Sequence, residues 1–338
     1  MGNFRHIELD KEIDLVGIGN AIVDLIVNVE DIFLETNNLQ KGSMSLIGIS
    51  QSDLLLQNCE VIKKVSGGSS ANTVVSLANF GKKVQFMGRV KDDYFGNIFS
   101  NDIKESGTIF NMNPINSEES SAHSIIFITP DAQRTMCTYL GASIEFDKED
   151  INEISIRKSK YLYLEGYLWD GKLAKKAFIE AANIAKESET KIILSLSDSF
   201  CVDRHRDSFL DLIKEYIDIL FCNEEELKSL LKEQNIHKCK NKISSICPLV
   251  IITLGNKGSI IFSEDKKIEI EPYALGEVID TTGAGDIYAG GFINGLINNY
   301  SLEKCGRLGS ICAGHIITQI GSRTNQKLNK LINDNLAN

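Results

Sequence analysis

The segment that decides the fold covers residues 280–293 and reads Asp280-Thr281-Thr282-Gly283-Ala284-Gly285-Asp286-Ile287-Tyr288-Ala289-Gly290-Gly291-Phe292-Ile293. The small residues at 283–285 allow backbone N–H groups to approach a ligand closely. The apolar run that follows predicts a helix over residues 286–298, and a helix N-terminus carries free donors and a partial positive charge. Asp286 would lie beside this anion site, where it could take the proton of a hydroxyl that attacks a phosphoryl group. An aspartate that only caps a glycine-rich turn is the structural alternative.

The composition is that of an ordinary soluble globular protein and restricts the possible partners. The chain has 338 residues, of which 43% are hydrophobic and 24% are charged, and its net charge is -10. The negative charge argues against a nucleic-acid partner, because nucleic-acid phosphates would be repelled. We find neither an apolar run of about 20 residues nor an N-terminal signal segment, so we expect a cytoplasmic protein without a membrane partner. The eight cysteines contain no Cys-x-x-Cys pair, which argues against a zinc ribbon or a thioredoxin motif.

Hydrophobic periodicity predicts alternating strands and helices. We expect strands within 13–29 and at 84–88, 124–129, 161–164, 192–196, 219–222, 250–254 and 259–262. We expect helices at 70–80, 172–187, 207–217, 224–233, 286–298 and 302–319. This order predicts an α/β fold with a doubly wound, mostly parallel sheet and helices on both faces. We expect one domain over residues 1–338, with a small β lid from the turn-rich segments at about 24–48 and 113–142.

Two common nucleotide-binding motifs are missing from the sequence. Gly17 and Gly19 match the first two glycines of a dinucleotide fingerprint, but Ile22 stands where its third small residue is needed. Extended sequence also follows where that motif needs a helix. The P-loop pattern Gly-x-x-x-x-Gly-Lys-Ser/Thr does not occur. If the chain binds a nucleotide, the phosphates must be held by another element.

Together with 280–293, four further stretches resemble the ribokinase-like (pfkB) family of carbohydrate and nucleoside kinases, and the adenosine kinase branch most closely. They are 17–24 (Gly-Ile-Gly-Asn-Ala-Ile-Val-Asp), 67–72 (Gly-Gly-Ser-Ser-Ala-Asn), 223–226 (Asn-Glu-Glu-Glu) and 253–258 (Thr-Leu-Gly-Asn-Lys-Gly). The resemblance implies the ribokinase-like fold and an ATP-dependent phosphotransferase that uses Mg²⁺.

The resemblance also implies roles for individual residues. In the catalytic group, Asp286 would be the base, Gly283, Ala284 and Gly285 the anion hole, and Arg134 a contact of the transferred phosphate. Around the acceptor, Asn20, Asp24, Gly67, Gly68 and Asn72 would bind the sugar ring, while Ile22, Met44, Leu46, Met136, Leu140 and Leu168 would face a base. A carboxylate such as Asp24 has several acceptor positions and can hold two neighbouring hydroxyls. A core or lid contact is the structural alternative for the apolar set.

Three further elements would hold the nucleotide and its ions. ATP would contact Asn223, Thr253, Gly255 and Gly258, and a monovalent cation, usually K⁺, would lie near Asp280 and Thr282. Asn223 and Glu226 would organise Mg²⁺ through water, because Mg²⁺ keeps several waters and few direct protein ligands. An acidic first turn that complements a helix dipole is the alternative for Glu226, and a plain hairpin turn is the alternative for the two glycines.

We therefore predict an ATP-dependent kinase that phosphorylates the 5′-hydroxyl of a nucleoside, with adenosine converted to AMP. The alternatives are a sugar kinase of the same family acting on ribose, fructose or a relative, a guanosine or inosine kinase, and a ligand sensor without catalysis. The partner would be a small molecule, and the protein would be a monomer or a homodimer.

Overall fold

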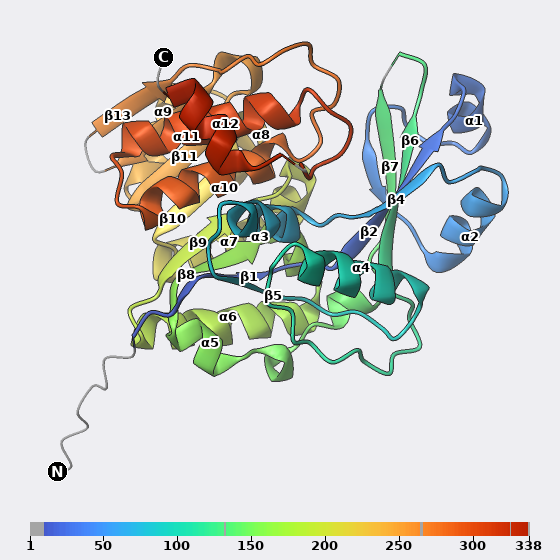
Figure 1. Cartoon of the computed structure of the whole chain (residues 1–338), viewed down its shortest axis with the longest axis horizontal. Coiled ribbons are helices and arrows are strands. Elements are labelled where there is room, and N and C mark those ends of the chain that lie inside the picture. Colours follow the sequence, from blue (N-terminus) through green and yellow to red (C-terminus); the bar gives the residue numbers. More distant parts are fainter. Residues whose placement is uncertain (1–9, 132, 264–265, 325, 337–338) are drawn as a thin grey trace.

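Two β-sheets of different size form the framework of the protein. The computed structural model describes residues 10–131, 133–263, 266–324 and 326–336. Figure 1 shows a large sheet packed among helices and a small sheet that projects from one side of it.

The large sheet has eight strands and is parallel over most of its width. In spatial order its strands are β13 (Lys266–Ile270), β12 (Ser259–Ser263), β11 (Leu249–Thr253), β10 (Ile219–Asn223), β9 (Lys191–Ser195), β8 (Ser159–Glu165), β1 (Ile13–Ile18) and β5 (Val84–Met87). All neighbours from β5 to β11 pair in parallel, while β12 and β13 are antiparallel additions at one edge. The expected doubly wound, mostly parallel sheet is confirmed.

The central strands are apolar on both sides, which explains why helices cover both faces. Successive side chains of a strand point to opposite faces, and strands buried on both faces read as continuous apolar runs. In β8, Leu162 and Leu164 belong to the core under one helical layer, and Tyr163 belongs to the core under the other. These three side chains are at most 1% exposed.

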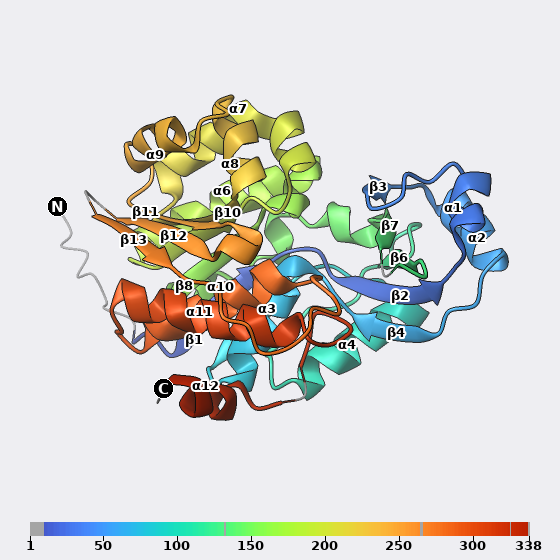
Figure 2. The same cartoon turned by 90° about the horizontal axis from the view of Figure 1, so that it is seen from above.

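Two helical layers enclose the large sheet, as Figure 2 shows. One layer contains α6 (Lys172–Glu187), α7 (Ser199–Tyr216), α8 (Glu224–Leu231) and α9 (Ile236–Ser244), with the short α5 (Glu153–Arg157) beside it. The other contains α3 (Ser69–Asn79), α4 (Tyr94–Glu105), α10 (Ala284–Ile297) and α11 (Leu302–Ile316), and α12 (Leu328–Leu336) packs against it from outside. Short 3₁₀ turns lie at Gly141–Glu145 (η1), Lys148–Asp150 (η2), Gly166–Asp170 (η3) and Gly255–Lys257 (η4).

The small sheet has five strands in the order β3 (Met44–Leu46), β7 (Arg134–Tyr139), β6 (Ala122–Ile128), β2 (Ile22–Asn28) and β4 (Lys63–Ser66). Helices α1 (Asp31–Thr36) and α2 (Ile49–Gln57) lie beside it (Figure 1). The segments 24–48 and 113–142, in which we expected a lid, contain β3, β6, β7 and most of β2. They miss β4, which pairs with β2 and leads directly into α3.

Helix α7 begins eight residues before the expected start at 207. The Asp198 carboxylate accepts a hydrogen bond from the Cys201 N–H and caps the helix there. The backbone at His205 leaves helical geometry, with φ -126° and ψ 17°. The periodicity is therefore interrupted at this kink, and only the second half of the helix was predicted.

Within the described ranges, no helix is both long enough and apolar enough to cross a membrane. The eight cysteines are free thiols, and seven of them are buried.

Candidate active site

A cavity of about 780 Å³ lies between the two sheets. Its floor is formed at the carboxyl ends of the parallel strands, where open α/β sheets bind their ligands. There Asn20, Glu165, Ser195, Asn223 and Thr253 follow or end β1, β8, β9, β10 and β11, and all five line the cavity. Side chains of the small sheet form its roof.

The start of helix α10 forms one wall of the cavity. Gly283 is the N-cap in a left-handed conformation, with φ 76°, and a Cβ there would lie 2.4 Å from the Cβ of Ser322. A Cβ at Gly285 would meet no atom within 4 Å, because this glycine faces the open cavity. The Ala284 N–H points to the Thr281 carbonyl at 3.2 Å, so it is not directed at an external anion in this arrangement. The Gly285 N–H lies in the first turn of α10 beside the open cavity, where it can donate to an anion.

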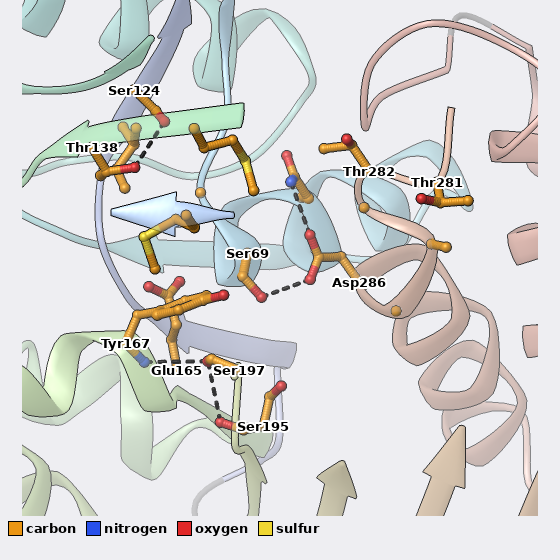
Figure 3. Close-up of a pocket in the computed structure, with 18 of the residues that line it drawn as sticks. Ser69, Ser124, Thr138, Glu165, Tyr167, Ser195, Ser197, Thr281, Thr282 and Asp286 are labelled. Carbon is orange, nitrogen blue, oxygen red and sulfur yellow. Dashed lines mark hydrogen bonds between the residues drawn. The ribbon is translucent and has the colours of Figure 1, made fainter. Parts of the chain in front are cut away.

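Two side chains from helix α3 hold the carboxylate of Asp286. The Ser69 hydroxyl donates to Oδ1 at 2.6 Å, and the Asn72 amide donates to Oδ2 at 3.0 Å. Figure 3 shows Ser69 and Asp286 facing each other across the floor of the cavity. Burial raises the pKa of Asp286 to about 6, although both hydrogen bonds and the charge of Arg323 lower it. Asp286 is therefore an ionised acceptor at neutral pH, with a pKa close enough to neutrality for general-base work.

The glycine turn before α3 brings Asp24 and Asn20 to the same end of the cavity. A Cβ at Gly67 would lie 2.3 Å from Oδ2 of Asp24, so the carboxylate packs directly against this backbone. Gly68 has φ 88°, and a Cβ there would lie 2.4 Å from the Asn20 carbonyl oxygen. Burial raises the pKa of Asp24 to about 7, with the charge of Arg323 as the largest opposing effect. Asn20, Asp24, Gly68 and Asn72 line the cavity together.

Glu165 is a buried acid that the sequence did not single out. It lies at the end of β8, is 1% exposed, and accepts hydrogen bonds from the Asn20 N–H, the Asn20 amide and the Ser70 N–H. Burial raises its pKa to about 7. Glu165 thus connects the ends of two strands to the start of α3.

Arg134 reaches from the small sheet to the loop before α10. It forms an ion pair with Oδ2 of Asp280 at 2.8 Å and donates to the Thr282 hydroxyl at 3.1 Å. The Asp280 carboxylate also accepts from the Thr282 N–H at 2.8 Å and from the Gly321 N–H at 2.7 Å. Among the described contacts, these use two of the five N–H donors of the guanidinium.

Asp280 and Thr282, next to which we expected a monovalent cation, are both held by Arg134. Asp280 has a fully buried side chain, its charge is already paired with Arg134, and both of its oxygens accept hydrogen bonds from the chain itself. The Thr282 oxygen accepts from the same guanidinium. This donor set does not fit K⁺ in the present arrangement, because the guanidinium takes the position of a cation between the two residues.

Asn223 and Glu226 form a reciprocal cap at the start of α8. Oδ1 of Asn223 accepts from the Glu226 N–H, while the Glu226 carboxylate accepts from the Asn223 N–H at 2.9 Å and from its amide at 2.6 Å. Both residues line the cavity, and burial raises the pKa of Glu226 to about 7. No cluster of three or more potential metal-binding side chains occurs in the part of the chain that is described. The pair therefore fits water molecules around a nucleotide-bound Mg²⁺ better than a resident metal.

The residues expected near ATP divide into two groups. Thr253 lines the cavity, but Gly255 and Gly258 do not. Gly258 has φ 82°, and a Cβ there would lie 2.0 Å from the Ile270 carbonyl oxygen, so the hairpin packing alone requires a glycine. The hairpin packing accounts for the glycine at 258 only, and the contact of Gly255 and Gly258 with ATP stays a prediction.

An apolar slot lies at the small-sheet end of the cavity. Five expected residues line it, namely Ile22, Met44, Leu46, Met136 and Leu140. Leu168 is a correction, because its side chain is fully buried in the core beneath the α6–α9 layer. In the 3₁₀ turn η3, Tyr167 and Asp170 lie three residues apart on the same side and line the cavity instead.

Several polar groups complete the slot. Figure 3 shows Tyr167 and Ser197 on one side and the hydroxyl pair of Ser124 and Thr138 on the strands above. The Tyr167 N–H donates to the Ser197 hydroxyl at 3.2 Å, and the hydroxyls of Ser124 and Thr138 lie 2.8 Å apart. Burial raises the pKa of the Tyr167 phenol well above its usual value, so the ring stays neutral.

The site residues predicted from the sequence do not include Ser69, Glu165, Tyr167 and Arg323, nor two apolar side chains at the cavity mouth. Ser69 and Tyr167 were within reach of sequence reasoning, since each is adjacent to a residue that we selected. Val278 and Ile279 line the cavity although they are 57% and 50% exposed, and exposed apolar side chains beside a cavity are typical of ligand contacts.

Several known proteins are similar to this chain over most of its length. The sequence model of a family described as pfkB family carbohydrate kinase matches residues 13–328. The nucleoside kinase of Methanocaldococcus jannaschii is 26% identical over 311 residues, which cover 91% of each chain. The 5-dehydro-2-deoxygluconokinase of Clostridium perfringens is 24% identical over 327 residues, which cover 93% of this chain and 90% of the relative.

Two solved structures are similar over almost their whole length. The probable sugar kinase from Rhizobium etli CFN 42 has a TM-score of 0.92 and 38% identity, covering 96% of this chain and 98% of the other. The adenosine kinase from Sinorhizobium meliloti has a TM-score of 0.91 and 39% identity, covering 96% and 99%. These relatives differ in their named acceptors, so they leave the choice between a sugar and a nucleoside open.

Proposed function

The chain belongs to the pfkB family of carbohydrate kinases and is a phosphotransferase with an alcohol acceptor, and from this premise we propose that it transfers the γ-phosphoryl group of ATP to the 5′-hydroxyl of a nucleoside. We propose adenosine as the main acceptor and AMP as its product. The observation that carries the proposal is the position of Asp286, held by two donors of α3 in a cavity that combines a sugar-sized polar end with an apolar slot.

The reaction needs one proton transfer and one displacement. The acceptor hydroxyl lies against Asp286, which takes its proton as the oxygen attacks the γ-phosphorus. The new O–P bond forms while the bond to the bridging oxygen of ADP breaks, and ADP leaves with that electron pair. Ser69 and Asn72 keep the carboxylate in place, so the proton acceptor needs no reorganisation during the reaction.

The developing charge is met by groups that converge on the start of α10. The Gly285 N–H and the helix dipole stabilise negative charge there, and Arg134 approaches the same place from the small sheet. Mg²⁺ bound with ATP would supply further positive charge to the phosphates. Asn223 and Glu226 would orient its water molecules. Val278 and Ile279, with Thr253, would contact the nucleotide at the cavity mouth.

The charge of the cavity supports a neutral acceptor. Six acidic side chains line it, namely Asp24, Glu165, Asp170, Glu226, Asp280 and Asp286, whereas Arg134 is the basic residue among the described lining residues. Asp24 and Asp286 stand at the acceptor end, whereas Arg134 stands with the start of α10, where the phosphates of ATP would lie. A phosphate on the acceptor would therefore lie against carboxylates rather than against Arg134.

The apolar slot supports a nucleoside rather than a free sugar. A free sugar has hydroxyls on all sides and needs polar partners for them, while a base has two apolar faces. Asn20, Asp24 and Asn72 would hold the ribose hydroxyls, and the base would lie between Tyr167 and the methionine side chains of β3 and β7. Met44 and Met136 are cross-strand partners in the register of these strands, so they offer one continuous apolar surface.

The polar groups of the slot and the similar proteins bear on the identity of the base. The hydroxyls of Ser124 and Thr138 can each donate or accept, so they suit the amino group of adenine and also the carbonyl oxygen of hypoxanthine or guanine. We propose adenosine because the similar structures include an adenosine kinase at 39% identity. Inosine and guanosine remain as secondary acceptors.

The small sheet would act as a lid. It contributes Arg134 to the phosphate site and most of the apolar slot, so closing it would complete both and exclude water. Exclusion of water would limit the wasteful hydrolysis of ATP.

A product analysis tests this proposal. The protein is incubated with ATP, MgCl₂ and adenosine, and the products are separated and identified by ³¹P NMR. We expect 5′-AMP and ADP in equal amounts, and we expect 5′-deoxyadenosine to inhibit without being phosphorylated. Phosphorylation of ribose or fructose, but of no nucleoside, would instead support the sugar kinase alternative.

A further inference from the structure

Arg323 connects the chain after α11 to the start of α3, directly beneath the cavity. Its Nε donates to Oδ1 of Asn72 at 3.2 Å, and its second terminal nitrogen donates to the Gly67 carbonyl at 3.3 Å. Asn72 is only 4% exposed, so this contact lies inside the protein. Arg323 does not line the cavity itself and therefore acts on a ligand only through other residues.

The guanidinium decides which way the Asn72 amide points. Arginine has donors and no acceptor, so the amide oxygen must face Arg323. The amide nitrogen then faces Oδ2 of Asp286, to which it donates at 3.0 Å. The flipped amide would place its nitrogen against the guanidinium and its oxygen against the carboxylate, and both contacts would be repulsive. The two charged neighbours therefore fix a single orientation.

The same guanidinium supports the turn that holds Asp24. Its second hydrogen bond holds the Gly67 carbonyl, and a Cβ at Gly67 would lie 2.3 Å from the Asp24 carboxylate. A displacement of this turn would therefore be transmitted to Asp24.

Arg323 is also the main counter-charge for the acids around it. The groups that face Asp286 are Ser69 and Asn72 from α3, Glu165, Tyr163 and Tyr167 from β8 and the turn after it, Glu226 from α8, Asp24 from β2, and Arg323 itself. The charge of Asp286 raises the pKa of Asp24, Glu165 and Glu226, whereas the charge of Arg323 lowers the pKa of Asp286 and of Asp24. Burial lowers the pKa of Arg323 to about 10, so it remains charged at neutral pH. On its outer side Arg323 also faces Asp102 of α4.

We propose that Arg323 is a positioning residue for the phosphotransfer reaction, because it orients the Asn72 amide toward Asp286, holds the turn against Asp24, and supplies the positive charge that both carboxylates face. The inference rests on the proposed function, since it takes Asp286 as the base. Arg323 neither gives nor takes a proton in the reaction. The hydroxyl proton goes to Asp286, and ADP leaves with the electron pair of the broken O–P bond.

The test compares pH profiles of kcat/KM for variants of Arg323. Arg323→Met and Arg323→Gln remove the charge, Arg323→Lys retains it, and Arg307→Met replaces an exposed arginine of α11 as a control. Each protein is assayed between pH 5 and 9 with ATP, Mg²⁺ and an acceptor that the unmodified protein phosphorylates, and each is checked for folding by its melting temperature. Arg323→Gln keeps hydrogen-bonding groups, so it gives the answer if the methionine variant does not fold.

The acid limb of the profile is the fall of kcat/KM at low pH. We expect this limb to move upward by about one pH unit in Arg323→Met and Arg323→Gln, since loss of an opposite charge at short range shifts a carboxyl pKa by about 1–3 units. We also expect kcat at pH 7 to fall at least about tenfold, which corresponds to loss of one charge-assisted hydrogen bond in the support of the base. The lysine variant should keep the original limb with a smaller loss of rate, and Arg307→Met should match the unmodified protein. An unchanged acid limb in a folded neutral variant would overturn the proposal, even if the rate were lower.

The failure of the proposed function gives a different result. If the acid limb persists in Asp286→Asn, then Asp286 is not the base and the mechanism above is wrong. If sugars rather than nucleosides are phosphorylated, the acceptor assignment fails, but the Arg323 test can still be carried out with the sugar.

Discussion

Replacement of Asp286 by asparagine tests the role of the base with little disturbance of the structure. The amide has the same size as the carboxyl group, and its oxygen can still accept from Asn72. The hydroxyl of Ser69 can turn so that its oxygen accepts from the new amide nitrogen. Hydrogen bonds to both Ser69 and Asn72 are therefore kept. We therefore expect a loss of stability of about 1 kcal/mol or less.

The expected loss of activity is much larger, because an amide cannot take the proton of the acceptor hydroxyl. Removal of a general base typically costs about 10²–10⁴-fold in rate, and we expect kcat to fall within this range. The KM for ATP should change by less than about threefold, since Asp286 contacts the acceptor rather than the nucleotide.

The pH profile of kcat/KM is a second, independent test of the base. The base must be ionised to act, and its raised pKa is about 6, so kcat/KM of the unmodified protein should fall as the pH decreases through 6. At pH 5 about one tenth of the protein would carry the ionised base, and the rate should be about tenfold below its plateau. The Asp286→Asn variant should lack this limb.

The assay is a coupled measurement of ADP release, corrected for ATP hydrolysis without acceptor. Asp92→Asn is a matched control, because Asp92 is exposed and lies outside the cavity. A folded Asp286→Asn protein with turnover within tenfold of the original, and with the acid limb retained, would refute the assignment of Asp286.

Three further outcomes follow from the site. Tyr167→Leu should raise the KM for a nucleoside about 5- to 100-fold, since stacking on an aromatic ring is worth about 1–3 kcal/mol per base. The surface change Tyr94→Leu should leave this KM unchanged. Glu226→Gln should raise the Mg²⁺ concentration that gives the half-maximal rate, because the amide cannot accept both hydrogen bonds from Asn223. Glu224→Gln should be nearly silent, and equal effects of the two changes would indicate a general role of the acidic turn. Exchange of K⁺ for tetramethylammonium should change the rate less than about twofold, because Arg134 already neutralises Asp280. A strong dependence of the rate on K⁺ would show that Arg134 leaves Asp280 during turnover.

Much of the fold, and the meeting of residues at the start of α10, could be predicted because the relevant signals are local. Apolar strands alternate with amphipathic helices along the second half of the chain, and this order alone implies a parallel sheet. Asp286 and Gly285 share one short segment with the helix that positions them. The turn at Gly67 and Gly68 is likewise contiguous with Asn72.

The features that were missed depend on contacts between distant segments or on the rotation of a single turn. Arg323 lies 251 residues from Asn72, and Glu165 lies 145 residues from Asn20, so no local pattern indicates either pair. Tyr167 and Leu168 are neighbours, and only the 3₁₀ geometry of their turn decides which of them reaches the cavity. The pairing of Asp280 with Arg134 could not be predicted for a similar reason, because this ionic partner comes from a strand of the other sheet.

The most direct test of the account is a competition between acceptors in one reaction. Adenosine, ribose and fructose are present at equal concentration with limiting ATP and Mg²⁺, and the ratio of products gives the ratio of the kcat/KM values. The polar end of the cavity would serve all three acceptors, while only adenosine would also fill the slot formed by Tyr167, Met44 and Met136. We predict that AMP exceeds each sugar phosphate by at least about 100-fold, which corresponds to about 3 kcal/mol from the buried base. An excess of ribose phosphate or fructose phosphate over AMP would contradict the account.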